Sequence, residues 1–294
     1  MKIWLSIAVL SLCFFITTAY AAQPSAIQEA EGYDCMGYDK SRKATEDAAM
    51  TTAKRNAVQN ASSYIDAQTH VEDFELKKDL VSAYTNGTIG TVQILEKGWY
   101  KDPSMGECYK IKIKAEVIPD EKAMKKVARD KKIADDPLGP LAVQVWTDKK
   151  DYSGGEKIKI YIKGNKPFYA RVLYKDVKGE LLQLLPNPYR TDDYFNGGVI
   201  YEIPSGNDKF EIEVSPPFGE ESITVLASTS PLGEINLEAT GGVYQVKTKP
   251  KDVGDRTRSV QLKEVFKAAD DILKGKRPTG AEFFEEKVTI KTGR

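Results

Sequence analysis

Small apolar residues recur at helical spacing from 41 to 67, where a run of alanines falls on one helix face. A strict alternation of apolar and polar residues follows at 109–118, which is the pattern of a strand with one buried face. We therefore predict that residues 24–119 form a small α+β domain. Its predicted elements are strands at 30–37, 91–100 and 109–118 and helices at 41–67 and 71–84.

The pattern changes between residues 141 and 247, where short alternating runs are separated by turns rich in Gly, Pro, Asn and Asp. No helical pattern interrupts these runs, which disfavours a parallel α/β sheet and predicts an all-β sandwich or barrel. The predicted strands lie at 142–147, 157–163, 168–175, 181–185, 199–203, 210–214 and 223–228.

Charged and amphipathic segments frame this β domain. Residues 120–140 are interpreted as a linker, in which Asp120 caps a charged helix and a Pro- and Gly-rich stretch ends it. Residues 248–294 are expected to begin with an exposed connector at 248–258 and then to pack on the sandwich. The packing elements are an amphipathic helix over 262–273 and a closing strand over 283–292, although the helix is also a candidate for docking a partner.

The N-terminus has the features of a secretory leader. Lys2 precedes an apolar run at 3–16, and Ala19 and Ala21 fit a cleavage site for signal peptidase. The run is shorter than the roughly 20 apolar residues that a membrane-spanning helix needs. We therefore predict a signal peptide at 1–21, export by the Sec route to the periplasm or cell surface, and cleavage after Ala21. The alternative is an uncleaved anchor helix.

Export changes the interpretation of the cysteines. Cys13 lies in the leader and follows Leu12, whereas a lipidated cysteine needs a small residue before it. Cys35 and Cys108 remain, on the first and last strands predicted for the α+β domain. In an oxidising compartment two such residues predict one disulfide, with two free buried thiols as the alternative. If the two strands are neighbours, a Cα separation of about 5.5 Å makes the bridge feasible.

The net charge argues against one class of partner, although a neutral total is compatible with a local basic patch. The chain carries 43 basic and 43 acidic residues, so its formal net charge is zero. Because binding to phosphates needs a basic surface, we expect no nucleic acid as a main partner.

The residue types that usually carry catalysis or bind metals are scarce. The single histidine, His70, lies between two predicted helices without a nucleophile motif, and zinc would need three or four convergent ligands. Gly275-Lys276 lacks the other residues of a phosphate-binding loop. The oxygen-rich loop at 192–197 is a calcium candidate without the EF-hand spacing, and an ordinary polar turn explains it more simply. We expect no catalytic residue, cofactor or metal site.

Aromatic residues of the β domain offer a further candidate, a sugar- or peptide-binding face, although tyrosines in the core are the commoner case. The tyrosines concerned are Tyr161, Tyr169, Tyr174 and Tyr189.

Two resemblances add to these patterns. The strand ending at Gly37, the Ala-rich helix and the closing strand that ends in Ala-Glu-Val-Ile-Pro at 115–119 resemble the N-terminal domain of flagellar assembly protein T and related small outer-membrane lipoproteins. That resemblance implies a domain of envelope proteins with assembly or scaffolding roles. The pattern Gly-Glu-Leu-Leu-Gln-Leu-Leu-Pro-Asn at 179–187 resembles an uncharacterised domain of exported bacterial proteins. That second resemblance implies an immunoglobulin-like sandwich and transfers no activity.

These observations predict a non-enzymatic exported protein that binds or assembles with another component of the cell envelope, either a protein or a glycan. An edge strand of the predicted sheets is a candidate for recruiting that partner. The first alternative is a hydrolase that acts on cell-wall or polysaccharide substrates through paired carboxylates. The second alternative is a regulatory domain for another protein.

Overall fold

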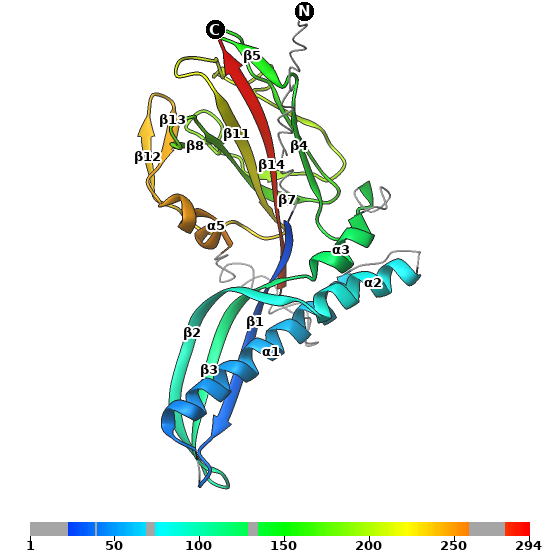
Figure 1. Ribbon diagram of the computed structural model, residues 1–294, viewed down its shortest axis with the longest axis vertical. Coiled ribbons are helices and arrows are strands. Elements are labelled where there is room, and N and C mark those ends of the chain that lie inside the picture. Colours follow the sequence, from blue (N-terminus) through cyan, green and yellow to red (C-terminus); the bar gives the residue numbers. More distant parts are fainter. Residues whose placement is uncertain (1–22, 39, 69–73, 129–134, 259–279) are drawn as a thin grey trace, which may run out of the picture.

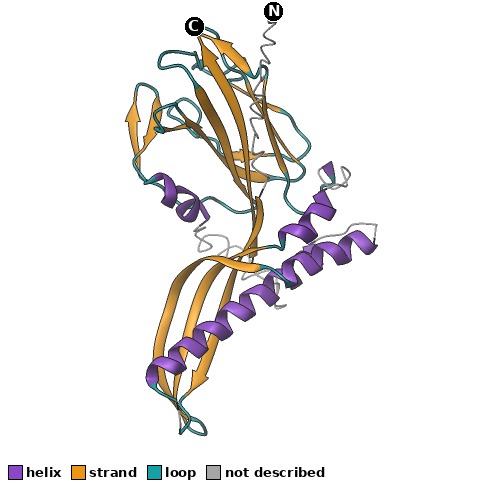
Figure 2. Cartoon of the chain, viewed as in Figure 1, coloured by secondary structure: helices purple, strands orange, loops and turns teal. Residues whose placement is uncertain are grey.

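The computed structural model describes residues 23–38, 40–68, 74–128, 135–258 and 280–294. Figure 1 shows an elongated molecule, with a long helix against a curved sheet at one end and a compact β-rich part at the other. Helices are concentrated around the N-terminal sheet, as Figure 2 shows. The predicted signal peptide, His70, the helix predicted at 262–273 and Gly275-Lys276 lie outside the described residues.

The N-terminal part is the predicted α+β unit. Its elements are β1 Gln23–Cys35, α1 Arg42–Gln68, α2 Phe74–Thr85, β2 Thr88–Asp102, β3 Gly106–Ile118 and α3 Glu121–Ala128. The three strands pair antiparallel in the order β1–β3–β2. The Asp120 carboxylate accepts a hydrogen bond from the Ala123 backbone N–H at 2.9 Å, which confirms the predicted helix cap.

Close approach of α1 to β1 explains the alanine face. Ala49, Ala53, Ala57 and Ala61 of α1 are fully buried against the sheet. Gly32 of β1 lies directly beneath this helix, and a Cβ atom there would overlap backbone atoms of Ala49 and Ala53. The helix and the strand therefore touch through their backbones, which only small residues on both sides allow.

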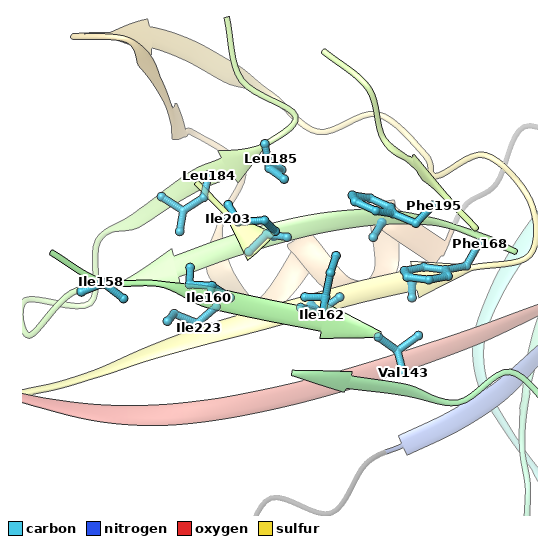
Figure 3. Packing of buried hydrophobic residues seen from close by; sticks show 14 of the residues in the cluster. Val143, Ile158, Ile160, Ile162, Phe168, Leu184, Leu185, Phe195, Ile203 and Ile223 are labelled. Carbon is cyan, nitrogen blue, oxygen red and sulfur yellow. The ribbon is translucent and has the colours of Figure 1, made fainter. Parts of the chain in front are cut away.

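The β-rich part is a sandwich of two sheets. Its elements are β4 Val143–Thr147, β5 Asp151–Ser153, β6 Ile160–Gly164, β7 Phe168–Lys175, β8 Leu181–Leu185, β9 Tyr194–Phe195, β10 Tyr201–Ile203, β11 Glu220–Ser228, β12 Leu237–Thr240, β13 Val243–Val246, α5 Pro250–Arg258 and β14 Gly280–Gly293. A three-stranded sheet, β10–β6–β4, faces the larger one. Figure 3 shows residues of one shared core, in which Ile160 of the small sheet lies beside Ile203 and Ile223 and Ile162 lies toward Phe168 and Phe195.

One strand joins the two parts into a single sheet. Residues 283–291 of β14 pair with β11 of the sandwich, and residues 280–285 pair with β1 of the N-terminal part. The large sheet therefore runs β12–β13–β8–β7–β11–β14–β1–β3–β2. Figure 1 shows β14 rising from its start beside β1 to the top of the sandwich, where the chain ends. The predicted closing strand is thus present, and it also binds the N-terminal sheet.

A buried polar cluster lies at this junction. The Glu282 side chain on β14 forms an ion pair with Lys166, with Nζ and Oε1 separated by 3.2 Å, and accepts a hydrogen bond from the Leu141 backbone N–H. Burial, reinforced by the Glu282 charge, raises the pKa of Tyr64 on α1 to about 12. The same two causes raise the pKa of Tyr84 on α2. The charge of Glu282, on the strand shared by both parts, therefore affects the pKa of tyrosines on the helices of the N-terminal part.

Several local predictions were wrong. Residues 250–258, expected to be an exposed connector, form the helix α5, in which Val253 and Thr257 are buried. No strand forms at 210–214, where the only pairing is an isolated bridge between Glu213 and Lys157. The hairpin of β12 and β13 lies where no strand was predicted. The helix α5 buries its side chains by contacts with distant residues, whereas the hairpin depends on its own Gly241-Gly242 turn, where both φ angles are positive.

Candidate functional site

The free edges of the large sheet are unequal. At one end, β12 has only four residues, and such a short edge offers little for another strand to pair with. At the other end, β2 is fifteen residues long and lies next to β3 alone. A long edge strand presents unpaired backbone N–H and C=O groups, which is the usual template for adding a strand from another chain.

The neighbouring edge, on β1, is covered by side chains. Beyond Gln28, β1 loses its partner β14, so its outer edge would be open. Asn56 and Asn60 of α1 close it, because their side-chain amides donate hydrogen bonds to the backbone oxygens of Glu31 (2.8 Å) and Glu29 (3.1 Å). The fold thus satisfies one exposed edge internally.

The outer edge of β2 has no such cover among the described residues. No described side chain makes a hydrogen bond to the β2 backbone on that edge, and most of the strand is exposed. Ile94 is 45 % exposed and Leu95 is 37 % exposed, and the two lie next to each other on this strand. Irregularities at 89–92 and 94–96 interrupt the pairing of β2 with β3, and residues 96–102 are paired with β3 without interruption.

The sheet face opposite α1 carries a charge ladder. Lysines of β3 pair diagonally with glutamates of β1, each through Nζ to a carboxylate oxygen. The pairs are Lys110–Glu31 at 2.7 Å and Lys112–Glu29 at 2.9 Å. Hydrogen bonding to these glutamates raises the pKa of both lysines. Because these ion pairs are partly exposed to solvent, we expect each to contribute little to the stability of the sheet.

The predicted disulfide lies at the far end of the same face. Cys35 and Cys108 are directly opposite in the β1–β3 register and are bonded, with their Cα atoms 3.9 Å apart. The strands are therefore neighbours, as the sequence argument required. Tyr33 and Tyr100 are exposed nearby on β1 and β2, at 57 % and 40 %. This end of the sheet combines a covalent clamp with exposed aromatic side chains.

The four candidate tyrosines do not form one face. Tyr161 stacks on Trp146, with centroids 5.6 Å apart, on the three-stranded sheet. Tyr169 contacts Tyr194 on the large sheet, and Tyr174 packs against the sandwich core. Tyr189 lies in a loop against Phe210. The structure therefore separates these side chains, and no shared sugar-binding surface follows from them.

The loop proposed for calcium contributes to the sandwich. The backbone oxygen of Asp193 accepts a hydrogen bond from the Ala170 N–H at 2.7 Å, and Phe195 is buried in the core. Burial raises the pKa of the Asp193 carboxyl. Among the described residues, no group of three or more His, Cys, Asp or Glu side chains converges as metal ligands.

Acids with perturbed pKa values are dispersed rather than paired. Burial raises the pKa of Glu286 to about 7. Glu286 lies between Phe284 and Val288 on the same inward face of β14. Asp193 instead interacts with Arg171, a buried residue whose guanidinium donates to Thr257 of α5 at 2.9 Å. The two carboxyls therefore lie in separate environments, whereas a glycosidase needs two acids facing one substrate.

Comparison with known proteins gives one match. Residues 151–231 match a family described as a domain of unknown function (DUF4384). This segment includes β5 to β11 and the Leu-Leu-Pro-Asn element, so the second resemblance is confirmed at this level. No curated protein and no solved structure matches the chain. No described helix is long and apolar enough to cross a membrane.

Proposed function

We propose that this chain is a non-enzymatic, exported binding or assembly module of the bacterial cell envelope, and that it recruits an extended segment of a partner protein through the outer edge of β2. The observation that carries the proposal is the contrast between the two edges of the N-terminal sheet. Asn56 and Asn60 satisfy the β1 edge, while the outer backbone edge of the fifteen-residue strand β2 has no hydrogen-bonding partner among the described residues. A partner strand would satisfy these backbone groups.

The rest of the fold supports this role. The β2 edge belongs to a sheet that continues through β14 into the sandwich, so it is held on a rigid frame. The Cys35–Cys108 bond fixes the strands behind it, and a disulfide suits an oxidising compartment outside the cytoplasm. The resemblance of the N-terminal unit to envelope assembly proteins points to the same kind of role.

A photo-reactive amino acid at Ile94 tests the proposal in cells. We expect a discrete cross-linked product with one envelope protein, because Ile94 lies on the proposed docking strand. The same amino acid at Ile200, which is 59 % exposed on the sandwich, is the matched control and should give no such product. Replacing the adjacent Leu95 by Lys should reduce the product about tenfold, because an edge lysine opposes strand addition.

Two results would count against this proposal. One is a product of equal yield from both positions, which would indicate general stickiness. The other is the absence of any product at Ile94 while the chain is intact and its mature N-terminus begins at Ala22, which would leave the β2 edge without a partner.

A further inference from the structure

The charge ladder ends on a lysine that has no partner. Each paired lysine of β3 reaches diagonally toward β1, and the next diagonal step brings Lys114 to Ile27 instead of to a glutamate. Glu29 lies opposite Lys114 in the register, but its carboxylate already holds Lys112. The alternation that builds the ladder therefore leaves Lys114 unmatched.

Lys114 is also buried. It is 6 % exposed, and its ammonium makes no hydrogen bond or ion pair with any described residue. Burial lowers the pKa of Lys114 to about 8, against the weaker attraction of Glu29. A cation that is largely removed from water without an acceptor is costly, and residues with strongly shifted pKa values cluster at functional sites.

A small pocket opens beside this ammonium. Thr91 and Gln93 of β2 and Asp255 and Arg258 of α5 form its other walls, and its volume is about 20 Å³. A space of that size holds about one small polar group. Gln93 is exposed at the rim, and it belongs to the same edge strand that we assign to partner binding.

The acids of the pocket are already engaged. The Thr91 hydroxyl donates a hydrogen bond to the Asp255 carboxylate at 2.8 Å. The Glu116 carboxylate lies 2.8 Å from the Arg258 guanidinium, although that Nε–H does not point at it, and accepts from the Ser25 hydroxyl at 2.8 Å. Arg258 keeps an unused Nε–H but is paired with Glu116 and Glu285, whereas Lys114 has no ion pair with any described residue.

We propose that this pocket binds a single carboxylate group on Lys114, with the Gln93 amide as a second donor. A carboxylate is a compact monoanion that accepts hydrogen bonds from both groups. A phosphate carries more negative charge toward Glu116 and Asp255 than a carboxylate does, so it is repelled more strongly. The carboxylate comes either from a free small acid or from an acidic residue of an extended segment seated on β2. The carboxylate site does not depend on the proposed function. If the carboxylate comes from a segment seated on β2, the site becomes part of the proposed partner-binding edge.

Titration with sodium acetate at constant ionic strength tests the site alone. In NMR spectra of the full chain, we expect saturable shifts of the Gln93 side-chain amide and the Ala115 backbone amide, with phosphate at least tenfold weaker. Lys114→Met should weaken acetate binding at least tenfold, because the cation is lost while its length is kept. Lys112→Met is the matched control, since that lysine is already paired, and it should bind acetate within about twofold of the natural chain.

A second measurement, chemical modification of lysines, tests the site in the chain without any substitution. Acetate should slow acylation of Lys114 in the unaltered chain, as followed by mass spectrometry of peptides, without slowing acylation of Lys110. Acetate shifts that do not saturate, that persist unchanged in Lys114→Met, or that leave Lys114 acylation unaffected would overturn the proposal of a free-acid site.

Peptides distinguish the two sources. Two synthetic strands of alternating Thr and Val, one with a central Glu and one with Gln, are compared by the same shifts. A preference for Glu of at least tenfold that disappears in Lys114→Met assigns the carboxylate to a segment on β2. Equal binding of the two peptides, together with saturable acetate binding, assigns it to a free acid. If neither acetate nor the Glu peptide depends on Lys114, the site does not exist, whatever the Ile94 cross-links show about the β2 edge.

Discussion

At the residue scale, the candidate functional side chains are charged residues that are buried where the pattern of their strand predicts exposure or an apolar residue. Lys114 and Glu116 continue the polar side of an alternating strand, and alternation alone would leave them in solvent. They are buried instead, at 6 % and 4 % exposure, because α5 covers that end of the sheet. Glu286 likewise occupies an inward position of β14. Burial lowers the pKa of Lys114 to about 8 and raises the pKa of Glu286 to about 7.

Glu286→Gln should change how stability depends on pH. The pKa of Glu286 is raised from 4.5 to about 7 in the folded chain, so the folded state holds a proton that the unfolded state has released. Stability should therefore fall as pH rises from about 4.5 to about 7, and this part of the slope should vanish in the variant. Urea denaturation at several pH values measures it. Glu234→Gln, at an exposed position, is the control and should keep the natural slope.

Lys114→Met should stabilise the free chain. Burial lowers the pKa of Lys114 in the folded chain from 10.5 to about 8. Below pH 8 the folded chain must therefore hold a charged lysine in an unfavourable place, which lowers the free energy of unfolding. The penalty is on the order of 2–3 kcal/mol, and it should fade as pH rises from about 8 to about 10.5. Denaturation at pH 7 and pH 10 measures the difference. An unchanged or lower stability of the variant at pH 7 would contradict the assignment of Lys114 as buried and unpaired.

At the element scale, close contact between α1 and β1 determines which edge of the N-terminal sheet is closed. Gly32 lets the helix backbone descend onto the strand, and this brings Asn56 and Asn60 within reach of the strand carbonyls. β2 lies on the far side of β3, where α1 reaches it through Trp99, whose indole N–H donates to the Glu46 carboxylate at 3.1 Å. The open edge is thus a consequence of where the helix packs.

Gly32→Ala should destabilise the chain by about 3 kcal/mol, because the added methyl group meets backbone rather than a movable side chain. Gly98→Ala is the matched control, since nothing lies within 4 Å of a Cβ atom there. The control should change the free energy of unfolding by about 0.5 kcal/mol or less. Equal effects of the two substitutions would show that α1 does not rest on Gly32.

Reduction of the disulfide should cost about 4 kcal/mol in the chain-entropy description, because Cys35 and Cys108 are 73 positions apart. Guanidinium denaturation with and without reductant measures it, with Cys35→Ser/Cys108→Ser as the matched chain. A loss confined to the N-terminal sheet, without any effect on the sandwich, would contradict the continuity of the large sheet through β14.

At the scale of the whole molecule, the local elements were largely predictable and their assembly was not. The alternation at 109–118 and the alanine spacing of α1 predicted both elements, because each depends on neighbours along the chain. The strand β14 was predicted as a closing strand of the sandwich, but its pairing with β1 joins residues more than 250 positions apart. The β2 edge, which has no strand partner beyond β3 in the described part of the chain, and the pocket at Lys114 both follow from that assembly. No local sequence pattern predicts either of them.

The shared strand predicts one cooperative unfolding transition. Trp99 reports on the N-terminal sheet and Trp146 on the sandwich. With Trp4 replaced, chains that keep only one of these tryptophans should unfold at the same denaturant midpoint. Glu282→Ala should lower both midpoints together, because it removes the buried partner of Lys166. Two separate midpoints would show that the parts unfold independently.

Backbone hydrogen exchange along β2 tests the central claim most directly. The full chain is mixed with an extract of its own cell envelope, and exchange is followed for each amide from Val92 to Asp102. Strand addition predicts slower exchange at alternate residues, those whose N–H groups point away from β3, with little change across the sandwich. Unchanged exchange along β2, together with protection at another surface of the chain, would contradict the account and place the binding site elsewhere.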